Sequence, residues 1–199
     1  MSGRVSVVPP GTAEVPHTAL VVGLRAGPEV RLIDPRTFGQ TAVLTRSELA
    51  AAGPARLGPD ALEELPSSRW LAARLSGRTA PIKALLLDQR LICGLGNIYA
   101  DEVLHRARLR PDRPAGSLDR GEVVALRAAV RPILEAGLRH GGTSLADLAY
   151  LLPDGRTGEF LPRLRAYGRA GRPCRRCGTA IVRIVQQGRS AYFCPGCQR

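Results

Sequence analysis

Four cysteines near the end of the chain are the residues whose type and spacing most clearly predict chemistry. Cys174 and Cys177 form one C-x2-C pair, Cys194 and Cys197 form a second pair, and sixteen residues separate the two. This spacing is typical of a tetrahedral zinc site in which each pair supplies two thiolates from a tight knuckle. Because four protein sulfurs fill every coordination position, we predict one structural zinc ion as the cofactor.

The residues between the pairs predict the scaffold of this metal site. Segment 179–193 reads as two short strands around a Gln-Gln-Gly turn, the pattern of a zinc ribbon. Two disulfides in an exported protein are the alternative, but the first residues, MSGRVSVVPPG, do not have the pattern of a signal peptide. An oxidised framework would also leave one of five cysteines unpaired. The fifth, Cys93 in LICGL, is expected to be an inert core thiol.

The charge of the chain favours a polyanionic partner. The 199 residues carry a net charge of +12, and 28 of the 29 basic residues are arginine, which a compositional habit would also explain. From Tyr150 to Arg199, however, ten arginines stand against two acidic residues, so eight of the twelve net charges lie in the last quarter. Clustered guanidinium groups suit phosphate, and no basic amphipathic helix carries the aromatic anchors of a membrane-surface protein. We therefore expect nucleic acid and no membrane as the partner.

Hydrophobic periodicity divides the chain into strands followed by helices. Up to about residue 47, short apolar and β-branched runs predict strands at RVSVV, TALVVGL, EVRLI and TAVL. From about Pro59, apolar residues at three- and four-residue intervals predict four helices: ALEELPSSRWLAARL, PIKALLLDQRLI, NIYADEVLHRARL and DRGEVVALRAAVRPILEAGLRH. A short helix near SLADLAYLL and a glycine-rich loop precede the ribbon. This order predicts an α+β fold.

The boundaries of the longest helix have their own signals. Ser117 or Asp119 can cap its start, with Glu122 completing a capping box from Asp119, and Gly141-Gly142 ends it.

The turn LICGLGNIYADE between two predicted helices is a candidate phosphate site. Gly94 and Gly96 permit a tight backbone path, and Asn97 opens the next helix with bare amide groups. On so short a match, an ordinary helix–helix turn capped by Asn97 is the more frequent explanation of these residues.

The wider context of this turn resembles a known family. APIKALLLDQRLICGLGNIYADEVLHRARLRPDR, followed by GGTS, AYGR and the two cysteine pairs, is similar to formamidopyrimidine-DNA glycosylase of the Fpg/Nei family, with its helix-two-turn-helix and zinc finger. MSGR, PHT and IDPRTFG look like that family's void-filling, phosphate-binding and DNA-wedge segments, so the resemblance covers essentially all 199 residues. It implies a partial β-sandwich at 1–58, a helix-two-turn-helix domain at 59–152, and a lesion loop with zinc ribbon at 153–199.

The resemblance also implies an activity. It is DNA base-excision repair by a bifunctional glycosylase and AP lyase that flips an oxidised or ring-opened purine out of damaged double-stranded DNA. A monomer in the bacterial cytoplasm, associated with the nucleoid, is expected. A non-catalytic damaged-DNA-binding zinc module is the alternative, and a ribosomal or transcription zinc ribbon would explain the cysteines alone.

Several site residues follow from the resemblance. Phe38 would be the aromatic wedge, Arg36 would face the orphaned base, and Met1 would fill space, whereas outside this motif they would pass for core and surface residues. Arg189 would touch the phosphate and take part in the second elimination step, its catalytic role. Contacts to the DNA backbone are implied for His17, Arg78 (the looser match), Lys83, Asn97 and Tyr167.

This chain departs from the family's pattern in the loop over the extruded base and at the nucleophile. Thr157, Gly158, Glu159 and Phe160 resemble the family's lesion loop, in which tyrosine often stands where this chain has Glu159. The family uses an N-terminal proline amine followed by glutamate, whereas this chain begins Met-Ser-Gly-Arg and also has no counterpart of the family's catalytic lysine. We therefore expect about seventy residues to precede Met1 in a complete family member.

Overall fold

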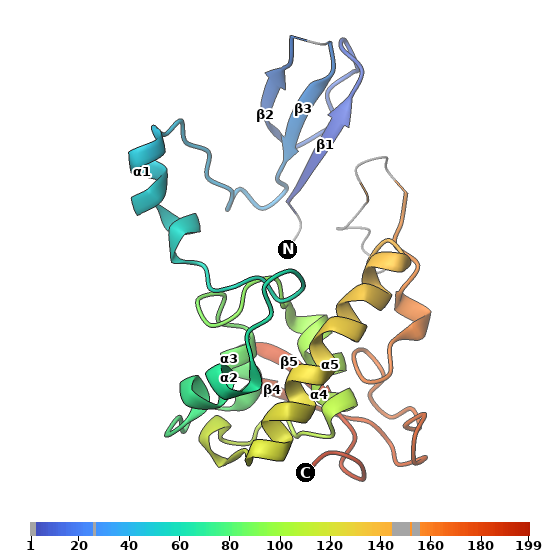
Figure 1. Cartoon of the computed structure of the whole chain (residues 1–199). Helices are drawn as coiled ribbons and strands as arrows, with labels where there is room; N and C mark the ends of the chain where they lie inside the picture. The colour runs from blue at the N-terminus through green and yellow to red at the C-terminus, as the bar shows by residue number, and fades with distance from the viewer. Residues whose placement is uncertain (1–2, 26, 145–151, 153–155) are drawn as a thin grey trace. The chain divides into compact units, whose positions relative to one another are not determined.

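The computed structural model describes residues 3–25, 27–144, 152 and 156–199 of the chain. It consists of helices and small antiparallel sheets, which confirms the predicted α+β class (Figure 1). The chain divides into two compact units, one formed by Met1–Leu44 with Gly137–Arg163 and the other by Thr45–Ala136 with Leu164–Arg199. The division at 1–58, 59–152 and 153–199 stays a prediction.

The first unit contains a three-stranded antiparallel sheet in the order β1-β3-β2 (Figure 1). Its strands are β1 Arg4–Val8, β2 Thr18–Gly23 and β3 Glu29–Ile33, which match three of the four predicted runs. The prediction of a strand at TAVL, residues 41–44, is wrong. Val43 is fully exposed, and among the described residues no strand pairs with this segment, so its backbone has no ladder of hydrogen bonds to hold it as a strand.

The second unit is built around a helical core. Its helices are α1 Arg46–Ala51, α2 Ser68–Leu75, α3 Ile82–Leu86, α4 Asn97–Ala107 and most of α5 Arg120–Arg139, with short 3-10 turns at Gly53–Arg56 and Ala115–Ser117. A third 3-10 turn, Leu161–Arg163, belongs to the first unit. Leucine, isoleucine, valine and alanine side chains of α2, α3, α4 and α5 form one buried cluster. This cluster positions the α3–α4 turn and α4.

Two predicted helices are shorter in the structure than in the sequence pattern. The first begins only at Ser68, because Pro66 precedes Ser67, whose hydroxyl accepts the Trp70 amide as the helix cap. The second ends at Leu86, where Asp88 forms turns with the residues after it.

The ends of α5 agree with the predicted signals. Asp119 and Glu122 exchange backbone-to-carboxylate hydrogen bonds of 3.0 and 2.7 Å, which is the capping box. Gly141 and Gly142 have φ values of 63° and 83° just after the helix, a conformation that favours glycine. The short helix expected near SLADLAYLL lies outside the described residues.

The C-terminal hairpin has the predicted ribbon form. Strands β4 Val182–Gln186 and β5 Arg189–Phe193 pair antiparallel around Gln187 and Gly188, which have φ values of 47° and 74°. Ile181, Cys174 and Cys194 form its small core. Among the described residues, no helix has both the length and the apolar composition needed to cross a membrane.

Candidate metal centre and nucleic-acid interface

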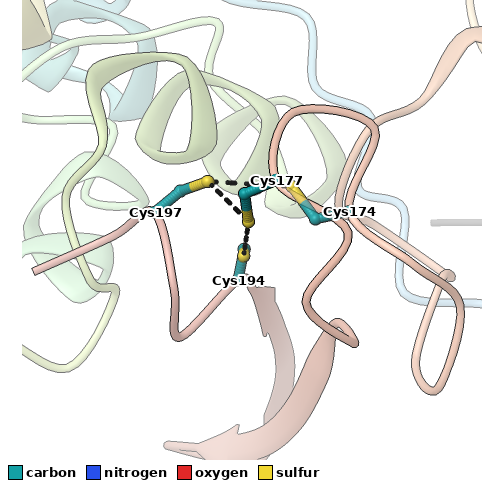
Figure 2. A group of neighbouring side chains, drawn as sticks. All are labelled: Cys174, Cys177, Cys194 and Cys197. Atoms are coloured by element: carbon teal, nitrogen blue, oxygen red, sulfur yellow. Dashed lines mark hydrogen bonds between the residues drawn. The ribbon is translucent and has the colours of Figure 1, made fainter.

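The four cysteine sulfurs converge on one point, as predicted (Figure 2). All lie within 4.8 Å of one another, with Sγ–Sγ separations of 3.1 Å for Cys177–Cys197, 3.4 Å for Cys177–Cys194 and 3.9 Å for Cys174–Cys197. A tetrahedral zinc site with bonds of about 2.3 Å has S–S edges of about 3.8 Å. The described cysteines form no disulfide, and the donor set fits one structural zinc ion.

The knuckle backbones are shaped for this convergence. The Arg176 amide donates to the Cys174 sulfur at 3.4 Å, as amides of C-x2-C knuckles can. A Cβ at Gly196 would lie 2.5 Å from the Thr179 hydroxyl, so a larger residue there would have to displace Thr179. Thr179 in turn lies 3.4 Å from the Cys177 sulfur.

Buried polar side chains of helix α4 accept hydrogen bonds from the C-terminal segment, residues 164–199, which contains the ribbon. Asp101 accepts the Tyr192 amide at 2.9 Å, and Glu102 accepts three amides, of Arg165, Ala166 and Tyr167, at 2.9 Å each. Asp101 is 0% exposed and Glu102 is 2% exposed. Burial raises the pKa of the Glu102 carboxyl, although these amides favour its charged form.

The importance of these two acids was not predicted from the sequence. Both lie in the segment NIYADEVLHRARL, which was predicted as a helix from its apolar periodicity, and that periodicity does not show whether a polar residue is buried. A signal was present nonetheless, because residues 164–199 contain eight arginines and no acidic residue, so any carboxylate partner of this segment must come from elsewhere in the chain.

Lys83 and Asn97 meet at a single carbonyl oxygen of the ribbon. The Lys83 Nζ donates to the Ser190 oxygen at 2.6 Å, and the Asn97 Nδ2 donates to the same oxygen at 3.2 Å. Lys83 is 1% exposed and also pairs with Asp101. Burial lowers the pKa of Lys83 in spite of the Asp101 charge. The structure therefore brings together two of the predicted DNA-contacting residues beside a third, Arg189.

The N-cap of α4 is Gly96 and not Asn97. Gly96 offers no side chain to cap the helix, and the Asn97 amide is used for the ribbon instead. The first turn of α4 therefore has no side-chain cap, and the positive end of the helix dipole at this turn favours an anion.

A hollow of about 380 Å³ lies between α3 and the ribbon turn. Lys83, Gln187 and the exposed Arg189 contribute to its walls, together with the Asp88–Arg90 ion pair of 3.0 Å. Arg90 was not singled out from the sequence. Arg78 is exposed and lies close enough to lower the pKa of Asp88, after the larger effect of Arg90.

Tyr167 lies beside the same group. Its ring makes an edge contact with Tyr192, with 5.0 Å between centroids, and its amide is held by Glu102. Burial raises the pKa of the Tyr167 hydroxyl, and a hydrogen bond with Asn97 partly offsets this.

In the first unit, the predicted wedge is a loop organised by Asp34. Its carboxylate accepts the amides of Arg36 at 3.3 Å and Gly39 at 2.5 Å. Phe38 is 79% exposed at the tip, with the Arg36 guanidinium 5.4 Å from its ring centre. His17, which is exposed with φ of 67°, accepts the Asp34 amide at its carbonyl. Met1 lies outside the described residues.

The predicted lesion loop is anchored at its second half. The Gly158 amide donates to the Ser144 hydroxyl at 2.8 Å, and a Cβ at Gly158 would clash with the Gly142 oxygen. Glu159 pairs with Thr143 in a β-bridge, and the Phe160 ring stacks on His140. Thr157, which precedes these contacts, is exposed.

Together the helices around the α3–α4 turn and the four-cysteine ribbon define a helix-two-turn-helix protein with a zinc finger. Family models support both parts: the formamidopyrimidine-DNA glycosylase H2TH domain matches residues 57–148, and the zinc finger found in FPG and IleRS matches residues 171–199.

Curated relatives extend the similarity to the whole chain. It is 43% identical over 199 residues to formamidopyrimidine-DNA glycosylase of Desulfitobacterium hafniense strain Y51, covering 100% of this chain and 72% of that protein. It is 45% identical over 203 residues to the enzyme of Heliobacterium modesticaldum, covering 100% and 73%. The chain belongs to the formamidopyrimidine-DNA glycosylase family, whose members act in DNA repair as glycosylases.

Solved structures of Fpg proteins are similar in fold to this chain. The MutM (Fpg) protein of Thermus thermophilus is 41% identical with a TM-score of 0.89, and the match covers all of this chain and 73% of that one. Lactococcus lactis Fpg in complex with DNA containing an abasic site is 29% identical with a TM-score of 0.87, covering 100% and 72%.

Proposed function

We propose that this chain grips damaged duplex DNA at an oxidised or ring-opened purine, as the DNA-binding part of a base-excision glycosylase and AP lyase. The observation that carries the proposal is the meeting of Lys83 and Asn97 at the Ser190 oxygen, beside Arg189. Three segments far apart in the sequence thus assemble one basic site at the N-terminal end of α4. Helix N-termini and guanidinium groups are ordinary ligands of DNA phosphate.

Within this site the residues have different roles. Arg189 is exposed and Asn97 is half-buried, so both can reach a phosphate. Lys83 is buried and neutralised by Asp101, so we assign it to holding Ser190 and Arg189 in place as well as to the backbone contact that the resemblance implies. Tyr167 and Arg78 complete this interface. Arg189 is also proposed to assist the second elimination step.

The wedge and lesion loop act on the opened base stack. Phe38 enters the stack, Arg36 faces the orphaned base, and His17 contacts the backbone beside them. The loop from Thr157 to Phe160 closes over the extruded base, where Glu159 alters the chemistry of recognition because it adds a negative charge.

The described residues supply no nucleophile for this chemistry. AP lyase activity needs an unprotonated amine at the sugar C1′, and the chain's one lysine, Lys83, is buried in an ion pair with Asp101. We therefore propose that the 199-residue polypeptide binds abasic DNA without excising a base, which is the behaviour of a damaged-DNA-binding zinc module.

Binding measurements test the proposal. Fluorescence anisotropy with a duplex containing a tetrahydrofuran abasic analogue should show that Arg189→Ala weakens affinity roughly tenfold or more, because a charge-assisted hydrogen bond is lost. The slope of affinity with salt should fall by about one. Arg106→Ala removes the same charge from the far end of α4 and is the matched control. Equal losses in the two variants would refute the site.

Borohydride trapping tests the missing nucleophile. The 199-residue polypeptide should form no covalent adduct with abasic DNA, and an adduct that disappears in Lys83→Arg would contradict the role given to Lys83.

We also propose where the protein acts and that it is a monomer. Because duplex DNA is the ligand and the relatives named above are bacterial, we propose that the protein acts on chromosomal DNA in the bacterial cytoplasm. We propose a monomer, because the site is assembled from one chain. Sedimentation of the free polypeptide checks this.

A further inference from the structure

The last turn of α4 contacts the metal centre directly. His105 is 0% exposed, and its Nε2 lies 3.4 Å from the Sγ of Cys174, which is itself 3% exposed. The carbonyl of His105 accepts a hydrogen bond of 3.3 Å from the Arg176 guanidinium, a residue of the same knuckle. The helix and the knuckle are thus joined at two points.

The chemistry of the sulfur determines the direction of this hydrogen bond. A cysteine that binds zinc is a thiolate, so it has no proton and can only accept. The ring of His105 must therefore carry its proton on Nε2. The Nδ1 atom, which is buried without a hydrogen-bond partner among the described residues, is then a bare acceptor.

We propose that His105 is a positioning residue of the zinc centre: its Nε2–H donates to the Cys174 thiolate and ties the zinc knuckle to the C-terminal end of α4. The bond draws negative charge from the sulfur and holds the ligand in one orientation, as partners of metal ligands do. It also fixes one end of the helix whose other end receives the ribbon at Asn97.

A ring kept only to fill the core would not account for these contacts. The bare Nδ1 acceptor lowers stability, so phenylalanine would fill the same space at smaller cost. Histidine has an advantage at this position only if its second nitrogen binds something, and the atom within reach is the Cys174 sulfur.

Two substitutions separate the hydrogen bond from the volume. His105→Phe keeps the ring and removes the donor, whereas His105→Gln places an amide N–H near the position of Nε2. In zinc-loaded protein, release of zinc to a chromophoric chelator should be about tenfold faster or more for His105→Phe and close to wild type for His105→Gln.

Cobalt(II) provides a spectroscopic signature. The sulfur-to-cobalt charge-transfer bands should shift in His105→Phe and remain in place in His105→Gln. His140→Phe, the same change in the other unit, should alter neither zinc release nor the bands. Zinc release and bands like wild type in His105→Phe would overturn the proposal.

A measurement on the unsubstituted protein decides the matter if His105→Phe does not fold. Long-range proton–nitrogen correlation in the zinc-loaded chain should place a proton on Nε2 of His105. A ring protonated on Nδ1 alone would overturn the proposal. None of these readouts depends on DNA binding, so failure here is distinct from failure of the proposed function.

Discussion

The Lys83 Nζ lies 2.7 Å from Asp101 Oδ1, and neither side chain is more than 2% exposed. This pair joins α3 to α4, while Lys83 and Asp101 also bind the backbone of β5 at Ser190 and Tyr192. One buried ion pair thus links the two helices of the proposed phosphate site to the zinc ribbon.

Removing the charge of Asp101 should destabilise the second unit strongly. Asp101→Asn leaves Lys83 buried without a counter-charge, and we expect the free energy of unfolding to fall by about 3–5 kcal/mol. Asp112→Asn makes the same change in the Arg110 pair, where both side chains are more than a third exposed, and should cost about 1 kcal/mol or less. Urea unfolding followed by circular dichroism compares them. Similar losses in the two variants would contradict a larger contribution of the buried Lys83–Asp101 pair to stability.

The Asp101 carboxyl should lose its proton at a higher pH than an ordinary aspartate does. Burial, the largest effect, raises its pKa to about 6, against the opposing Lys83 charge. Since the folded state then holds this proton more tightly than the unfolded state, the contribution of Asp101 to the free energy of unfolding decreases as pH rises from about 4 to about 6. A shift of about two units corresponds to roughly 3 kcal/mol. A carbon-13 titration with a midpoint at or below 4 would contradict this.

Glu102 should control the turn that carries Tyr167. Glu102→Gln replaces one carboxylate oxygen with an NH2 group that faces backbone donors, so we expect a loss of about 2 kcal/mol in the free energy of unfolding. Hydrogen exchange at residues 165–167 should accelerate. Glu135→Gln, which weakens a half-exposed pair with Arg131 at 3.7 Å, is the control and should leave these amides unchanged.

Phe38 should act on lesion discrimination without affecting folding. Its ring is 79% exposed, so Phe38→Ala should leave the free energy of unfolding within about 0.5 kcal/mol. The ratio of affinities for abasic and intact duplex should drop, by roughly tenfold, because the wedge contributes only when the base stack is open. Val43→Ala, at another exposed apolar residue nearby, is the control. Equal weakening on both duplexes would argue against a wedge.

Local signals were sufficient where a feature depends on neighbouring residues. The capping box of Asp119 and Glu122 and the Gln-Gln-Gly turn both follow from hydrogen bonds and φ values within a few residues. The strand expected at TAVL failed for the opposite reason: a strand needs a partner, and β-propensity does not indicate whether one is present.

The polar face of α4 shows the same limit. Helical periodicity placed Asp101, Glu102 and His105 on a helix, but a solvated face and a buried interface have the same spacing. Only the packing of residues 164–199 against α4 shows that these three side chains bind an amide of β5, a backbone turn and a zinc ligand.

The sequence by itself determined the zinc ligands, the α+β class and the family, because metal spacing, periodicity and an ordered series of motifs are all written along the chain. Tertiary structure decided which polar groups are buried and what they bind. Lys83 lies 107 residues from Ser190 and His105 lies 69 residues from Cys174, and no local rule of spacing reaches across such distances. Their contacts exist because the helical core and the metal hairpin pack together, which places these side chains out of reach of water.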